Sequence, residues 1–158
     1  MTSSDRLVDG YWLATHRADP RAYALYARHY SAEKNARSRR SVTANFLGPG
    51  ECMVLLTIGC DALFAWQRNT VKRLDGQAGV ICTVFRNESL ALSSLLIREA
   101  CDLAWQRWPG ERLFTYIADA KVRSSNPGYC FKMAGWRTCG RNKDGRLTIL
   151  ERLPECEP

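Results

Sequence analysis

The longest segment with a helical repeat of apolar side chains, residues 89–108, lies between runs of apolar residues, and this order constrains the fold most. The apolar face of this predicted helix carries Leu92, Leu95, Leu96, Ala100, Leu103 and Ala104. Asn87 or Ser89 can cap its first turn, and Pro109-Gly110 ends it. A helix with one continuous apolar face needs a partner layer, and the neighbouring runs supply one if they form strands.

Four apolar segments predict these strands: residues 53–58, 62–67, 80–86 and 113–117. The runs at 54–58 and 80–85 are almost continuously apolar, which is typical of strands that are covered on both faces. Three further elements complete the predicted order: a first helix from Asp19-Pro20 to about residue 30, a short helix at 128–134, and a hairpin of 136–139 with 146–151. The pattern predicts an α/β fold with a mixed sheet, in a single domain of 158 residues.

The segment at 31–50 is polar and basic, and we expect an exposed loop there. It ends in the turn sequence Leu47-Gly48-Pro49-Gly50. The net charge of the chain is +7, and a basic surplus of this size favours polyanionic partners. Lys34, Arg37, Arg39 and Arg40 form the tightest cationic cluster, so we expect them to contact the phosphates of a nucleic acid. A solvated basic loop without a partner is the alternative.

The cysteines bear on the compartment. The chain has seven of them, an odd number, and none forms a Cys-x-x-Cys pair. A secreted disulfide framework would be denser and usually even in number, and a structural zinc site would show paired spacing, so we expect reduced thiols. The first ten residues lack the apolar centre of a signal peptide, and no apolar run approaches the length that a membrane span needs. We therefore expect an intracellular protein that does not cross a membrane.

The segment from Asn126 to Trp136 resembles the late motif of the GNAT acyltransferases, in which a short helix ends in glycine and an aromatic residue. Here Asn126 would cap the helix, Gly135 would end it in a left-handed conformation, and Trp136 would return to the core. The resemblance covers about residues 50–152. It implies a mixed, mostly antiparallel central sheet flanked by helices, with an acyl-CoA or related donor.

One part of the chain departs from the GNAT pattern. In that family the strand before the long helix leads into a glycine-rich turn whose amides hold the pyrophosphate of the coenzyme. Residues 87–94 contain no glycine, and Glu88 would oppose an anion. A helix N-terminus still attracts phosphate. Asn87, Ser89 and Asn126 are the expected cofactor-binding residues if the coenzyme binds.

A more particular resemblance rests on three short motifs: His29-Tyr30-Ser31, Phe85-Arg86-Asn87-Glu88, and Asp119 followed by the residues from Ser124 to Tyr129. Together they are similar to the phage Mom-type DNA adenine modification proteins. This implies transfer of a methylcarbamoyl or other acyl-type group to the exocyclic amine of adenine in double-stranded DNA, in the host cytoplasm. The modification would protect phage DNA from restriction.

The candidate catalytic residues follow from these motifs. His29 is the predicted general base or metal ligand, with Tyr30 beside it, because imidazole transfers protons near neutral pH. Asp119 would orient His29, accept a hydrogen bond from adenine, or join it as a ligand for iron or a similar metal. Tyr129 resembles the family's general acid, and Ser124 would donate a hydrogen bond to substrate.

Each of these residues also has a purely structural interpretation. His29 can stabilise the end of the first helix, Asp119 can form a turn, Ser124 can cap a helix, and Tyr129 can pack on the sheet.

Two other functions fit the same sequence. The chain can be an ordinary acyl-CoA N-acyltransferase for a protein or a small amine, or a nucleic-acid-binding module without catalysis. The sequence leaves the oligomeric state open, with a homodimer as one option.

Overall fold

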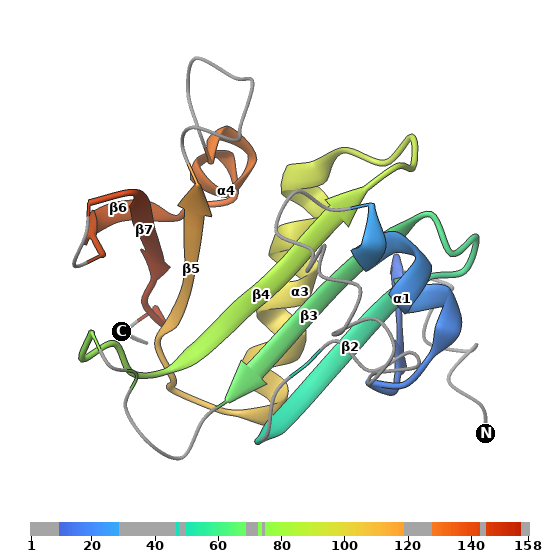
Figure 1. Cartoon of the computed structure of the whole chain (residues 1–158), viewed down its shortest axis with the longest axis horizontal. Helices are drawn as coiled ribbons and strands as arrows, with labels where there is room; N and C mark the ends of the chain where they lie inside the picture. Colours follow the sequence, from blue (N-terminus) through green and yellow to red (C-terminus); the bar gives the residue numbers. More distant parts are fainter. Residues whose placement is uncertain are drawn as a thin grey trace.

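The structure is a computed structural model that describes residues 10–28, 47, 50–68, 73, 75–118, 128–142 and 145–155. One seven-stranded sheet runs through it in the order β1-β2-β3-β4-β5-β7-β6 (Figure 1). The strands are β1 Trp12–Thr15, β2 Glu51–Thr57, β3 Ala62–Arg68, β4 Val80–Asn87, β5 Leu113–Ala118, β6 Arg137–Arg141 and β7 Leu147–Arg152. Neighbouring strands pair antiparallel except β4 and β5, which pair in parallel. The predicted α/β class with a mixed, mostly antiparallel sheet is confirmed.

Helices cover the two faces of this sheet. The helix α3, Ser93–Arg107, buries Leu96, Ile97 and Ala100 against one face, in a cluster that contains Phe64 and Trp66 of β3. The helix α1, Pro20–Ala27, packs Ala22 and Leu25 against the other face of the sheet. A third helix, α4, spans Tyr129–Met133 and lies between β5 and β6 in the chain.

The edge strand β1 was not predicted from the sequence. Its four residues are too few for an apolar repeat, and tertiary contacts hold them in place. The Glu99 carboxylate of α3 accepts hydrogen bonds from the backbone N–H groups of Tyr11 and Trp12, at 2.8 to 3.0 Å. The Trp12 indole donates to the Leu96 carbonyl at 2.8 Å. β1 is therefore fixed by α3 as well as by its pairing with β2.

The predicted starts and ends of the helices need correction. The long helix begins at Ser93 and not at Ser89; its N-cap is Leu92, without a side-chain capping bond. The first helix ends at Ala27, with Arg28 as its C-cap, so within the described residues it is shorter than expected. The N-cap of α4 is Gly128, with a φ of 78°, where Asn126 had been expected.

Two other expectations concern the basic loop and the thiols. Leu47, in the stretch that we expected to be exposed, is buried in the cluster with Ala22 and Leu25; the other residues of 31–49 lie outside the described residues. The six cysteines among the described residues are free, as predicted, and Cys82 and Cys101 are buried. Burial raises the pKa of the Cys101 thiol to about 11, so it stays protonated near neutral pH. No helix in the described parts of the chain is long and apolar enough to cross a membrane.

Candidate functional site at the carboxyl ends of β4 and β5

The parallel strands β4 and β5 separate soon after they begin. Their ladder consists of three pairs, from Val80 with Leu113 to Cys82 with Thr115, while β4 continues to Asn87 and β5 to Ala118. Thr83 is an extra residue in the pairing of β4 with β3, and this bulge follows the last pair with β5 directly. Figure 1 shows the two strands diverging toward their carboxyl ends. Ligands of open α/β sheets bind at such ends, so this part of the molecule is the candidate site.

An ion cluster ties the end of α1 to the end of β4. The Glu88 carboxylate accepts hydrogen bonds from Arg28 at 2.8 and 2.9 Å and from Arg86 at 2.5 Å. Arg86 also donates to the Arg28 carbonyl at 2.8 Å. The guanidinium of Arg28, with that of Arg86, lowers the pKa of Glu88 to about 2, so the carboxylate is charged at neutral pH. The cluster therefore carries two cations and one anion.

The turn after β4 is held together by its own polar side chains. The Asn87 carboxamide donates to the Ala91 carbonyl at 2.8 Å and to the Ser93 hydroxyl at 2.9 Å. Its oxygen accepts from the backbone N–H and the hydroxyl of Ser89, at 2.9 and 2.5 Å. The Ser89 hydroxyl accepts from the Ala91 N–H at 3.1 Å. The carboxamide of Asn87 and the hydroxyl of Ser89, the expected cofactor-binding groups, are thus hydrogen-bonded within the turn.

Tyr129 stands at the start of α4 with 54% of its surface exposed. Gly128 sets its position, because a Cβ at Gly128 would lie 2.6 Å from Leu150 and 3.5 Å from Ile117 near the end of β5. Phe131 anchors the helix in the core, where its ring contacts those of Phe85 and Trp136 at centroid distances of 5.9 and 4.9 Å. The phenol of Tyr129 is consequently displayed to solvent at the β5 side of this end, and its predicted packing role is not observed.

All of the other predicted site residues lie outside the described residues: His29, Tyr30, Lys34, Arg37, Arg39, Arg40, Asp119, Ser124 and Asn126. The described chain nevertheless shows where two of these segments attach. Arg28, which precedes His29, is bonded to Glu88 after β4, and Ala118, which precedes Asp119, is the last residue of β5. Both attachments are at the carboxyl ends of the parallel strands. No three His, Cys, Asp or Glu side chains of the described residues gather as a metal site would require.

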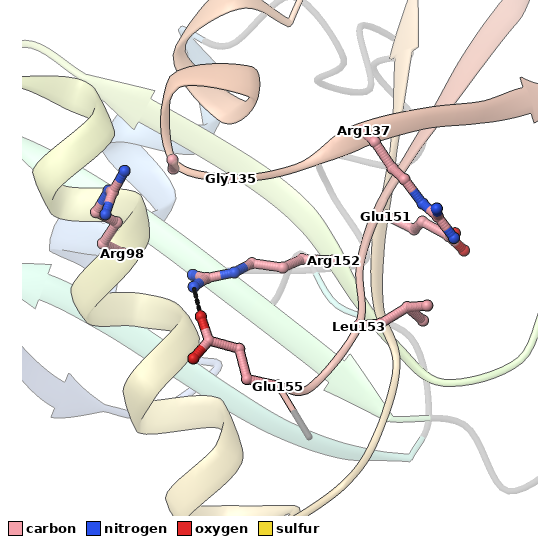
Figure 2. Close-up of a pocket in the computed structure, with 8 residues that line it drawn as sticks. Arg98, Gly135, Arg137, Glu151, Arg152, Leu153 and Glu155 are labelled. Atoms are coloured by element: carbon pink, nitrogen blue, oxygen red, sulfur yellow. Dashed lines mark hydrogen bonds and ion pairs between the residues drawn. The ribbon is translucent and has the colours of Figure 1, made fainter. Parts of the chain in front are cut away.

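A cavity of about 430 Å³ lies away from these strand ends, between α3, the α4–β6 connection and the end of β7. Arg152 extends from β7 toward α3, and Glu155 meets its guanidinium at 3.8 Å (Figure 2). Arg98 lines the α3 side and donates to the Met133 carbonyl at 3.0 Å. Sequence reasoning missed this cavity, because Arg98 and Arg152 share no motif and are brought together only by the tertiary fold.

The Glu151 carboxylate is another wall of this cavity. Arg112 donates to it at 2.7 Å and Arg137 at 2.9 Å. Arg112, together with Arg137, lowers the pKa of Glu151, so this carboxylate is charged and already paired. The described lining contains three arginines and two glutamates, so the cavity is cationic on balance.

No protein-family model matches the chain, and no curated protein sequence matches it.

Proposed function

We propose that this protein is a GNAT-like transferase that modifies the exocyclic amine of adenine in double-stranded DNA. One observation carries the proposal: the exposed Tyr129 starts α4 beside the end of β5, while Arg28, bonded to Glu88 after β4, and Ala118, the last residue of β5, precede His29 and Asp119. An imidazole, a carboxylate and a phenol are the groups that a proton-coupled transfer to an amine requires.

The adenine amine is a weak nucleophile because its lone pair is delocalised into the ring, and in a duplex it is paired and stacked. An enzyme that modifies it must extrude the base and remove a proton as the new bond forms. We assign proton removal to His29, its orientation to Asp119, and protonation of the leaving group to Tyr129. Tyr30 and Ser124 would hydrogen-bond the base. Lys34, Arg37, Arg39 and Arg40 would bind the phosphates, which fits the +7 charge.

The turn after β4 does not fit a pyrophosphate cradle as it is folded. Several of its amides already have acceptors: the Glu88 N–H donates to the Asp61 carbonyl, and those of Ser89 and Ala91 donate to side chains within the turn. No glycine brings further amides to one point. We therefore infer that the donor does not dock through a pyrophosphate at Asn87 and Ser89.

His29 and Asp119 are the residues that would hold a metal such as iron. Imidazole nitrogen and carboxylate oxygen suit iron, and the side chains that the structure describes supply no alternative cluster. Bound there, the metal would act as a Lewis acid on the group that is transferred.

The test is mass spectrometry of nucleosides from the DNA of a host that expresses the protein. We expect a mass-shifted adenine nucleoside with the intact chain, and its loss with His29→Ala and with Tyr129→Phe. His16→Ala is the matched control, because the chain has only two histidines, and His16 lies before α1, outside the proposed site. Host DNA that contains only ordinary nucleosides, with the protein folded and expressed, would contradict the proposal.

A further inference from the structure

An exposed apolar surface borders the proposed site. Its members are Leu90 and Leu92 in the turn after β4, Leu95 on α3, and Tyr129 and Met133 on α4, with exposed fractions of 107%, 64%, 45%, 54% and 51%. The two helices that carry it contact one another, because Arg98 of α3 donates to the Met133 carbonyl. Single exposed leucines are common on protein surfaces, but a group of five apolar side chains at one end is less so.

Leu90 is the most exposed of the five, and the backbone that presents it is well fixed. The residues on either side of it are bonded: Ser89 to Asn87, and Ala91 to both Asn87 and the Ser89 hydroxyl. Glu88 is anchored by its N–H to Asp61 and by its carboxylate to two arginines. The turn thus presents an apolar side chain to water from a rigid support, which is the arrangement expected of a group that inserts into a partner.

Cationic side chains occur on the same elements as this surface. Arg28 and Arg86 flank Glu88 next to Leu90, and Arg98 lies beyond Leu95 on α3. Duplex DNA offers the complementary pattern, since its phosphates form two charged rims and its stacked bases form an apolar interior between them. Proteins that unstack bases insert leucine, isoleucine, methionine or phenylalanine between them.

We propose that Leu90, supported by Leu92, is a wedge that enters the base stack of duplex DNA and occupies the space left by an extruded base. This inference rests on the proposed function, because a base must leave the stack before its amine can be modified. Leu90 is accordingly a positioning residue that acts on the neighbouring bases, whereas the proposed reaction takes place on the extruded one.

The test uses the purified full chain and duplexes that carry 2-aminopurine in randomised flanking sequence, because its fluorescence rises when the base leaves the stack. No donor group is needed. We expect a rise with the intact protein and a reduction of about tenfold or more in that rise with Leu90→Ala. Affinity for the same single strand should not change, because a single strand has no paired stack to open. Leu153→Ala is the control: Leu153 is 47% exposed and follows β7, whose last residue pairs with Leu113 at the start of β5.

The outcomes separate the two proposals. If the intact protein raises the fluorescence and Leu90→Ala does not, the wedge is supported, even where host DNA contains only ordinary nucleosides and the proposed reaction fails. Equal fluorescence with both proteins, or none with the intact protein, would overturn the wedge. So would a variant that binds DNA normally but loses binding to vesicles of phosphatidylglycerol, because the surface would then dock on a membrane. Circular dichroism of Leu90→Ala establishes that the variant is folded.

Discussion

Asp19 connects β1 to α1 through three interactions of one carboxylate. Its oxygens accept from the Arg21 backbone N–H at 2.9 Å, from the Thr15 hydroxyl at 2.6 Å and from the Arg21 guanidinium at 2.8 Å. The side chain is buried, so water cannot replace these partners. The hydrogen bonds from Arg21, and then from Thr15, hold the pKa of Asp19 well below its usual value of 3.8. The carboxylate therefore contributes to stability in its charged form.

We predict that Asp19→Ala lowers the free energy of unfolding by about 2 kcal/mol near neutral pH, because it removes a helix cap and leaves the Thr15 hydroxyl without this acceptor. Since the pKa is lowered by folding, the contribution is complete above the usual value and is lost as the pH falls through the folded-state value. Urea unfolding at several pH values measures it. Asp19→Asn keeps an oxygen that can accept the capping hydrogen bond, but its side chain does not titrate. The difference in the free energy of unfolding between this variant and the native chain should therefore shrink in acid. A difference that stays constant with pH would contradict this account.

The roles of individual polar side chains were the hardest feature to predict from the sequence. Asn87 and Ser89 were selected because such side chains bind phosphate or cap helices, and in the structure they close a turn instead. The same short polar side chains serve all three purposes, and sequence does not distinguish them. The sequence does not link Arg28 to Arg86 and Glu88, because the contact of Arg28 with Glu88 spans 60 residues of the chain.

At the scale of elements, continuous apolar runs located the central strands well. β3 and β4 begin at the predicted residues, Ala62 and Val80, because strands buried on both faces tolerate few polar residues. β1 could not be predicted in this way, since Glu99 of α3 and its pairing with β2 define it. The divergence of β4 from β5 could not be predicted either, because the bulge at Thr83 does not change the pattern of apolar residues.

Gly79 starts the parallel pairing of β4 with β5. Its φ is +125°, and a Cβ at this position would lie 2.3 Å from the Arg112 carbonyl oxygen, which accepts the Val80 N–H at 2.8 Å. We predict that Gly79→Ala lowers the free energy of unfolding by about 3 kcal/mol, through backbone strain and the displacement of that carbonyl. Gly76→Ala is the matched control: φ is +84°, nothing lies within 4 Å, and the expected loss is about 1 kcal/mol. Denaturant unfolding of the two variants compares them, and equal losses would show that the close approach is unimportant.

At the scale of the whole molecule, the sheet brings together segments that are far apart in the chain. Its one parallel pair brings the ends of β4 and β5 to the same side, and α1 reaches that side through Arg28. The net charge also belongs to the whole molecule. A charge of +7 attracts a polyanion over about a Debye length, near 10 Å in 0.1 M salt. A protein with this charge that binds DNA should therefore bind it with a strong dependence on salt.

We predict that the logarithm of the DNA affinity falls linearly with the logarithm of the salt concentration, with a slope of about −0.9 for each phosphate neutralised. Replacing Arg37, Arg39 and Arg40 together by serine should reduce that slope by about 2 to 3, since each residue is proposed to contact one phosphate. Arg107→Ser, in the last turn of α3, removes a cation where no DNA contact is proposed and should leave the slope almost unchanged. Fluorescence anisotropy with a labelled duplex at several salt concentrations measures all three slopes. If the triple variant keeps the native slope, the phosphates are bound elsewhere on the molecule, and the basic segment at 31–50 has no part in holding DNA.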